Sequence, residues 1–418
     1  MEISLGHAGA DENMYLSGLT VEGKRFFHSV TQRANDAEPR FQGSISDFSD
    51  AHPHLALQLR NMAKSCPRCG KSCAFNLPFC NGCNLGLTGA PSIYTENVCM
   101  GFVYGIEKNN CGRPLKLSLR LEEPDLLVYD DLLSRSSAHF NAIPTACHLP
   151  DWRHLLRNAA RGLALLRKLE DSCWRVALDQ FWNNDQWRCT TLKLDAFDSF
   201  EEFRKGVVIG INAVPSQFQV HVQCILPALF PADYHAFLRG KRFVKDRWLP
   251  LEFVIESLEA LHRSKDGGIC NAHILTMEEI LAAIEGAGGP RYEESHASAI
   301  RRYNDAHRAC ANWSVEYFDV AVLHRHPKLR PELLGAAADS KSRAHIEVRP
   351  VRRAGQTLAA QLTPTELEKR DKLAIQNYGW PYDEAEQPCP SSYYKFARKP
   401  GEVLSADEWV AGGFVMPS

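Results

Sequence analysis

The sequence predicts an α+β protein. Short apolar runs of strand length occur repeatedly between residues 93 and 230, and they lie on both sides of one long helical pattern. From residue 231 onward the pattern becomes mainly helical. With 418 residues, of which 44% are hydrophobic, the chain is long enough for two or three domains with a buried core. We therefore expect a sheet with one long helix in the middle of the chain, followed by a helical extension.

The first two predicted segments are small. Residues 1–60 form a polar N-terminal segment with one expected helix at 21–34 and a loop-like stretch near 42–50. Residues 61–92 contain a cluster of five cysteines and few large apolar side chains. Such a segment has little core of its own, so we expect a metal-binding module.

The third segment, residues 93–230, carries the predicted sheet. A helix is expected at 150–169, because leucines recur there at helical spacing. Runs that favour strands precede and follow this helix, at 99–104, 115–121, 126–130, 140–144, 207–212 and 219–226.

The fourth segment, residues 231–418, is predicted to be a mainly helical extension with an irregular tail. Helices are expected at 251–262, 276–285 and 292–313, with glycines after the second one as a stop signal. Thr363 and Glu366 form a capping-box pattern with a proline between them, which predicts a helix at 364–376. Residues 379–418 are rich in proline and aromatic side chains and lack periodicity.

Composition excludes several classes of protein. The 48 basic and 50 acidic side chains leave a net charge of −2, which gives no overall attraction to nucleic acids or anionic lipids. No apolar stretch is long enough to cross a membrane, and Met1–Asn13 does not resemble a secretory signal. Neither a phosphate-binding loop of ATPases nor a dinucleotide-binding glycine pattern occurs. We expect a protein of the cell interior, cytoplasmic or nuclear, with no membrane partner.

The cysteine cluster contains two knuckles of the C-x-x-C type. Cys66 and Cys69 form the first, and Cys80 and Cys83 form the second, ten residues later. Four thiolates in this spacing predict a structural zinc ion, because zinc favours closed tetrahedral sulfur sites. Redox-active or incidental thiols are the alternative. Cys73 is interpreted as a spare thiol.

The metal module also has features of a contact surface. Arg68, Lys71 and Phe75 lie within or beside the knuckles. Small exposed knuckles with basic side chains can contact phosphates, so an RNA or protein partner is one hypothesis and a purely structural clamp is the other.

A row of polar residues marks the last strand of the sheet. Gln219, His221 and Gln223 alternate with apolar residues, so they are expected on one face of the strand 219–226. Buried amides and imidazoles need hydrogen-bond partners, and a bound phosphate would supply several. An exposed sheet face with a structural histidine is the alternative.

Two stretches together resemble the histidine-triad (HIT) superfamily of nucleotide hydrolases and transferases. The first is Asp131 followed by the His139-Phe-Asn-Ala-Ile-Pro144 strand, and the second is the strand with His221. The resemblance covers residues 93–230 and implies a HIT-like antiparallel sheet with a long helix, a nucleotide or dinucleotide substrate, and a homodimer.

The resemblance also implies residue roles. His221 stands at the nucleophile position and would carry a nucleotidyl intermediate, whereas Gln219 and Gln223 replace the two outer histidines. These two glutamines and Ser216 could donate hydrogen bonds to phosphate oxygens. A second set of residues would complete the nucleotide site: Asp131 at the ribose, Asn212 near the phosphate and His139 behind the catalytic strand.

Two functions follow from these features. One is cleavage of a nucleotide phosphoanhydride by a hydrolase, transferase or phosphorylase through His221. The other is a catalytically weak or inactive adaptor that keeps the nucleotide pocket and binds nucleotide or RNA. Loss of the two outer histidines favours the second, because neutral amides stabilise less developing charge than imidazolium groups.

Overall fold

The computed structural model describes residues 40–311 and 396–412, apart from 76, 81–84, 113–114, 116–118, 132–133, 185–186, 189–190, 194–195, 230, 239, 241 and 246. The helices predicted at 21–34 and 364–376 lie outside these residues, as does Cys83. The described part is a mixed structure of helices and sheet, which agrees with the predicted α+β class.

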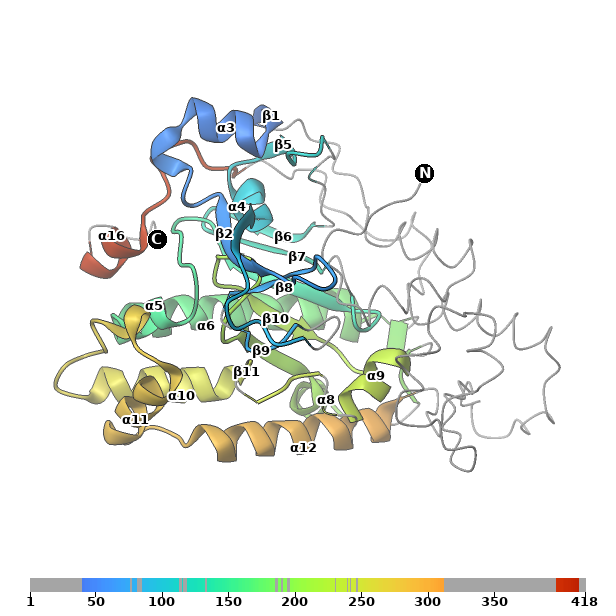
Figure 1. Ribbon diagram of the computed structural model, residues 1–418. Helices are drawn as coiled ribbons and strands as arrows, with labels where there is room; N and C mark the ends of the chain where they lie inside the picture. Colours follow the sequence, from blue (N-terminus) through green and yellow to red (C-terminus); the bar gives the residue numbers. More distant parts are fainter. Residues whose placement is uncertain are drawn as a thin grey trace, which may run out of the picture.

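A six-stranded sheet forms the centre of the molecule (Figure 1). All of its neighbouring strands are antiparallel. Four of the strands match predicted runs in position, the edge strand at 119–123 overlaps the end of the predicted run 115–121, and the other edge strand, at 248–250, was not predicted. In spatial order the strands are β11 (Trp248–Pro250), β9 (Val208–Asn212), β10 (Val222–Ile225), β8 (His139–Pro144), β7 (Leu126–Asp130) and β6 (Leu119–Glu123).

Helices cover one face of this sheet. The predicted long helix is divided into a short turn, α5 (Arg153–Leu156), and α6 (Ala159–Val176), whose N-terminus is capped by the side chain of Asn158. Leucines of α6 pack with α10 (Leu251–Arg263) against the alternate, apolar residues of the strands. The buried cluster includes Leu165, Leu166, Leu169, Val128, Phe140, Val222 and Cys224.

The segment after residue 230 contributes directly to the sheet. Strand β11 is an edge strand of the sheet, and the Tyr292 hydroxyl on α12 (Tyr292–Cys310) donates to the Trp248 carbonyl oxygen at 2.9 Å. The remaining helices of this part surround α10 and the sheet edge, and a returning C-terminal helix packs near α6. They are α9 (Pro231–Leu238), η3 (Ala272–Ile274), α11 (Met277–Gly286) and α16 (Ala406–Ala411). Helix α8 (Phe200–Gly206), which precedes β9, packs against α12.

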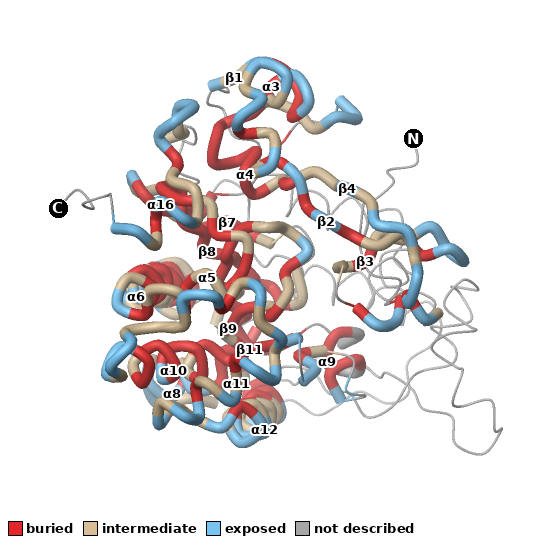
Figure 2. The backbone as a smooth tube through the Cα atoms, turned by 60° about the vertical axis from the view of Figure 1, so that its left-hand side comes forward, coloured by how far each residue is buried: buried red, intermediate tan, exposed pale blue. Residues whose placement is uncertain are grey.

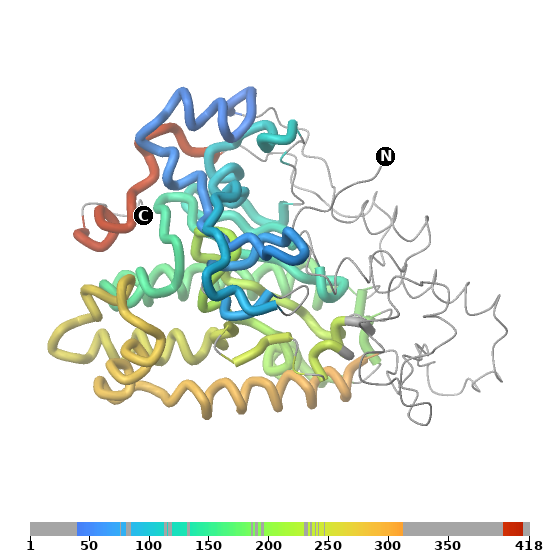
Figure 3. Tube along the Cα trace, viewed as in Figure 1, coloured from blue at the N-terminus to red at the C-terminus, as the bar shows by residue number. Residues whose placement is uncertain are grey.

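The N-terminal part forms a separate small sheet beside the large one (Figure 3). Its strand order is β3 (Ser72–Ala74), β2 (Arg60–Ser65) and β4 (Ser92–Glu96). A further parallel pair joins β1 (Phe41–Ser44) to β5 (Ile106–Lys108), and α3 (Ile45–Ala51) and η1 (Pro53–Leu55) connect β1 to β2.

The strand predicted at 99–104 is wrong, because these residues form helix α4 (Val98–Val103). Asn97 caps the helix by accepting a hydrogen bond from the Met100 amide. This helix is buried on every face, so nearly all of its residues are apolar. A continuous apolar run has no periodicity that distinguishes a helix from a strand.

Candidate functional site

A band of polar side chains lies on the sheet face opposite α6. Its members are Asp131, His139, Asn141, His221 and Gln223, which we call the polar band. The register pairs Gln223 with Asn141, and His139 with Ile225. Asp131 follows β7 and its amide donates to the His139 carbonyl at 2.8 Å. Three segments of the chain, the end of β7, strand β8 and the β10 segment, therefore bring these residues to one place.

The polar band separates two apolar clusters on the same face. On the β7 side, Leu127, Tyr129 and Ile143 pack against α4. On the β9 side, Val208 and Ile225 pack with aromatic residues of the later segment. The sheet is buried along most of its length (Figure 2), and His139, Asn141 and His221 are buried with it. Burying polar side chains costs free energy, so a buried polar cluster of this kind indicates a functional role.

His221 is held as a neutral imidazole with one nitrogen available. Its Nδ1 lies 2.8 Å from the Gln219 carbonyl oxygen, which can only accept, so Nδ1 carries the hydrogen. Burial lowers the pKa of His221, although that hydrogen bond and the charge of Asp131 oppose the shift. Nε2 therefore keeps its lone pair, and the Gln223 side-chain amide nitrogen lies 3.4 Å from it.

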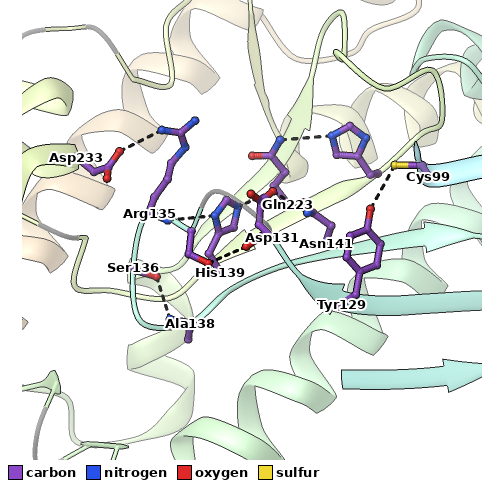
Figure 4. A network of polar contacts seen from close by, with 12 residues as sticks. Cys99, Tyr129, Asp131, Arg135, Ser136, Ala138, His139, Asn141, Gln223 and Asp233 are labelled. Carbon is purple, nitrogen blue, oxygen red and sulfur yellow. Dashed lines mark hydrogen bonds and ion pairs between the residues drawn. The ribbon is translucent and has the colours of Figure 1, made fainter. Parts of the chain in front are cut away.

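Asp131 is the acidic centre of the polar band (Figure 4). Its Oδ2 accepts from the Asn141 amide at 2.8 Å and lies 3.7 Å from His139 Nε2. The Arg135 backbone N–H donates to His139 Nδ1 at 3.3 Å, so the His139 hydrogen is on Nε2 and points to Asp131. The half-exposed carboxylate keeps one side toward solvent. His139 thus lies beside Asp131 on the same face, and not behind the strand that follows His221.

Gln219 is not part of the polar band, which corrects the predicted row of three. Its side-chain oxygen accepts from the Leu149 amide at 2.9 Å, and its side-chain nitrogen donates to the Pro144 and Cys147 carbonyls at 2.7 and 2.8 Å. Both amide hydrogens are used, and the side chain is fully buried. Gln219 therefore anchors the start of the β10 segment and has no hydrogen left for a phosphate.

We expect Gln219→Ala to destabilise the protein by about 3–5 kcal/mol, because three buried backbone groups lose their partner. Urea unfolding measures this change. Gln223→Ala is the matched control and should cost less than about 1 kcal/mol, since the Gln223 side chain is half-buried and makes one long contact. Equal losses for the two variants would contradict the anchoring role.

The two other predicted phosphate contacts lie at the margin of the site. Asn212 ends β9, opposite Trp248, and is half-buried. Ser216 is exposed in the loop between β9 and β10. The structure gives no contact that joins either side chain to His221 within the described residues.

The sequence analysis assigned no role to Asn141, although this residue lies in the His139–Pro144 strand. Its alternation with His139 places both on one face of β8, and this was the available signal. Only the register with β7 shows that its side chain reaches Asp131.

Three predicted metal ligands are brought together. The sulfur atoms of Cys66, Cys69 and Cys80 lie within 4.8 Å of one another, and the pair Cys69–Cys80 is 3.6 Å apart. A disulfide needs about 2.05 Å, so these are separate thiols that suit a shared metal ion. Cys73 Sγ is 3.7 Å from Cys80 Sγ and is buried, so Cys73 is one candidate for a fourth ligand. Cys83, the predicted fourth ligand, lies outside the described residues.

The metal module contacts the segment that leads to His221. On β2, the Asn61 side-chain oxygen accepts from the Phe218 amide at 2.6 Å, and the Phe75 ring meets the Phe218 ring edge-on at 5.9 Å. The Phe218 carbonyl accepts from Asn97 and His148 side chains at 2.9 and 2.8 Å. The module therefore fixes Phe218, the residue directly before Gln219, whose carbonyl orients His221.

Comparison of the chain with protein-family models, with curated proteins and with solved structures found no match. In the part of the chain that the structure describes, no helix is both long and apolar enough to span a membrane.

Proposed function

We propose that the protein is a HIT-like nucleotide hydrolase or transferase that cleaves a phosphoanhydride through a nucleotidyl intermediate on His221. The observation that carries this proposal is the state of His221: a buried, neutral imidazole whose Nδ1 hydrogen is fixed by the Gln219 carbonyl. Its Nε2 lone pair is the kind of nucleophile that in-line attack on phosphorus needs.

In this proposal the reaction has two steps. His221 Nε2 attacks the α-phosphorus, the P–N bond forms, and the bond to the leaving phosphate oxygen breaks. Water or phosphate then attacks the same phosphorus and releases His221. Gln223 donates its amide hydrogen to a nonbridging oxygen in place of its present contact with Nε2. Asp131, positioned by Asn141, accepts from the hydroxyls of the ribose.

The polar band supplies few acids for the leaving group. Gln219 is committed to backbone contacts and Gln223 is neutral, so neither protonates an alkoxide. A leaving group of two or more phosphates is stable as an anion and needs no such acid. The proposal therefore favours nucleoside triphosphates and dinucleoside polyphosphates over substrates with poor leaving groups.

The test is incubation of the protein with dinucleoside polyphosphates, cap analogues and nucleotide sugars, with and without inorganic phosphate, followed by separation of the products. Release of a nucleoside monophosphate identifies a hydrolase, and replacement of that monophosphate by a nucleoside diphosphate only when inorganic phosphate is present identifies a phosphorylase. Tight binding with no product supports the adaptor function instead.

We expect the acid limb of the kcat/KM profile to have its midpoint below pH 6.5. The folded protein holds the pKa of His221 below its ordinary value of 6.5, so the neutral nucleophile persists as pH falls and protonates only at lower pH. Initial rates between pH 4.5 and 8 measure this. A midpoint at or above 6.5 would contradict the neutral, buried nucleophile.

We propose zinc as the metal of the cysteine module. Sulfur atoms held about 2.3 Å from one zinc ion at tetrahedral angles lie about 3.8 Å apart. The separations of 3.6 and 3.7 Å at Cys80 support this geometry. The ion would hold the module together and take no part in the phosphoryl transfer.

An RNA-binding role of the module is favoured by one exposed sheet face. The register places Met62 opposite Tyr94, the Arg60 guanidinium lies 5.9 Å from the Tyr94 ring, and Lys64 continues the same face of β2. Tyr94 is 68% exposed, although a side chain as large as tyrosine usually packs against other residues. Cationic side chains around an open aromatic ring are typical of surfaces that stack single-stranded bases.

We expect Tyr94→Ala to weaken binding of a single-stranded RNA about tenfold, because base stacking on an aromatic ring contributes about 1–3 kcal/mol. Fluorescence anisotropy with a labelled oligonucleotide measures it. Leu57→Ala removes an equally exposed side chain outside this face and should have no effect. RNA affinity that is the same in both variants would contradict an RNA surface on β2 and β4.

A further inference from the structure

The last described segment of the chain, residues 396–411, connects the N-terminal part to the helices that cover the sheet, and we call it the strap. Near its start, the Arg398 amide donates to the Val103 carbonyl, the last residue of α4, at 2.9 Å. Near its end, Trp409 of α16 enters the core cluster beside α6, and the Arg161 guanidinium lies 5.3 Å from the centre of its ring. The strap therefore contacts both sides of the sheet.

The middle of the strap pairs with residues 146–149, which follow β8 and which we call the connecting segment. The Leu404 amide donates to the Ala146 carbonyl at 3.0 Å, and the Leu404 carbonyl accepts from the His148 amide at 2.8 Å. These two hydrogen bonds form a parallel bridge of the kind found between neighbouring strands. One edge of the connecting segment is therefore occupied by the strap.

The other edge of the connecting segment binds the residues that lead to His221. The Gln219 side chain donates to the Cys147 carbonyl at 2.8 Å and accepts from the Leu149 amide at 2.9 Å. The Leu149 carbonyl accepts from the Val220 amide at 2.6 Å. The Gln219 carbonyl in turn binds the Nδ1 hydrogen of His221 at 2.8 Å. Four residues thus separate the strap from the backbone that orients the imidazole.

Few buried side chains attach the strap. Within residues 396–411, all of which the structure describes, the buried ones are Val403 and Trp409. The Asp407 carboxylate pairs with Arg157 at 2.7 Å, but its side chain is 84% exposed. Segments with few buried apolar contacts open at a lower free energy than global unfolding requires. We therefore expect the strap to be released from a molecule whose core stays folded.

We propose that the strap is a regulatory element that positions His221. In the docked state the connecting segment is held on both edges, and the Gln219 carbonyl is fixed at the imidazole. Release of the strap frees one edge and loosens this carbonyl. The positioning follows from these contacts, whereas control of turnover rests on the proposed function of His221. Because coupling between sites is reciprocal, a nucleotide bound at His221 favours the docked strap.

Hydrogen exchange of the full chain, followed by mass spectrometry, tests the connection without any substrate. Asp407→Arg places a second guanidinium beside Arg157 at an exposed position, and Trp409→Ala removes the buried anchor. In both variants we expect the amides of residues 149 and 220 to exchange at least about tenfold faster, with unchanged exchange in α10. Trp409→Phe keeps an aromatic ring in the cluster and should restore most of the protection.

Trp174→Ala is the matched control. Trp174 also packs against the core cluster, and the Arg204 guanidinium lies 4.4 Å from the centre of its ring, but it belongs to the other end of α6. Its replacement should leave the exchange of residues 149 and 220 unchanged. Faster exchange that is confined to the strap and to residue 148, or an equal acceleration in Trp174→Ala, would overturn the inference.

Turnover separates this inference from the proposed function. With a nucleoside triphosphate, Asp407→Arg should lower kcat/KM at least about tenfold. Glu294→Arg reverses the charge of another exposed carboxylate that pairs with an arginine, and it should react at the wild-type rate. Wild-type turnover in Asp407→Arg would overturn control by the strap and leave the function of His221. The expected exchange in a protein that turns over no nucleotide would refute that function and leave the positioning by the strap.

Discussion

Replacement of His221 by alanine is expected to reduce nucleotide turnover by about a thousandfold or more, because it removes the imidazole whose Nε2 lone pair is the proposed nucleophile. Nucleotide affinity should change little, since Asp131 and Asn141 remain in place. Steady-state rates and equilibrium binding of a nonhydrolysable analogue measure the two quantities separately.

His54→Ala is the matched control, because His54 is an exposed histidine of the N-terminal part and contacts no residue of the polar band. It should turn over substrate at the wild-type rate. If His221→Ala keeps more than about a tenth of the wild-type activity, the nucleophile is elsewhere, and the proposed function of this site is wrong.

Replacement of Cys66 by serine is expected to remove the bound metal and to unfold the small sheet of the N-terminal part. Cys66 follows β2 directly, and its thiol is one of three that lie within 4.8 Å. Structural zinc supplies much of the folding free energy of such modules, so we expect a loss of more than about 4 kcal/mol. Metal analysis and near-ultraviolet circular dichroism measure the two effects.

Cys111→Ser provides the control, because Cys111 is an exposed free thiol outside the cluster. Comparison of Cys73→Ser with Cys83→Ser then identifies the fourth ligand, since only loss of a ligand lowers the metal content. Full metal occupancy in Cys66→Ser would contradict a metal site at these cysteines.

Loss of the metal should also disturb the conformation of the polar band. Asn61 and Phe75 of the module hold Phe218, and the Gln219 carbonyl next to it fixes the His221 hydrogen. Release of Phe218 would free the backbone that sets the imidazole orientation. The module and the candidate active site are therefore connected through residues 218–221.

Local pattern was sufficient to predict most of the sheet and the long helices. In strands β7, β8 and β9 the apolar residues either alternate with polar ones or form a continuous run. Helices α10 and α11 begin and end near the expected residues. The error at α4 arose because a buried apolar run has no face that sequence can distinguish.

Side-chain roles were harder to predict because they depend on contacts between distant segments. The alternation of 219, 221 and 223 suggested one row, but strand β10 begins only at Val222. Gln219 therefore turns toward the backbone of residues 144–149, between 70 and 75 positions away in the sequence. Likewise, no local pattern places Asp233 and Arg242 next to Arg135.

The covalent intermediate on His221 is tested most directly with a nucleotide labelled on its α-phosphate. The reaction is stopped within the first turnover, and the labelled residue is then identified by mass spectrometry. We predict an acid-labile nucleotidyl group on His221, absent from His221→Ala and formed before product. Product that appears in wild type without any protein-bound label, or a label on another residue, would contradict a covalent intermediate at His221.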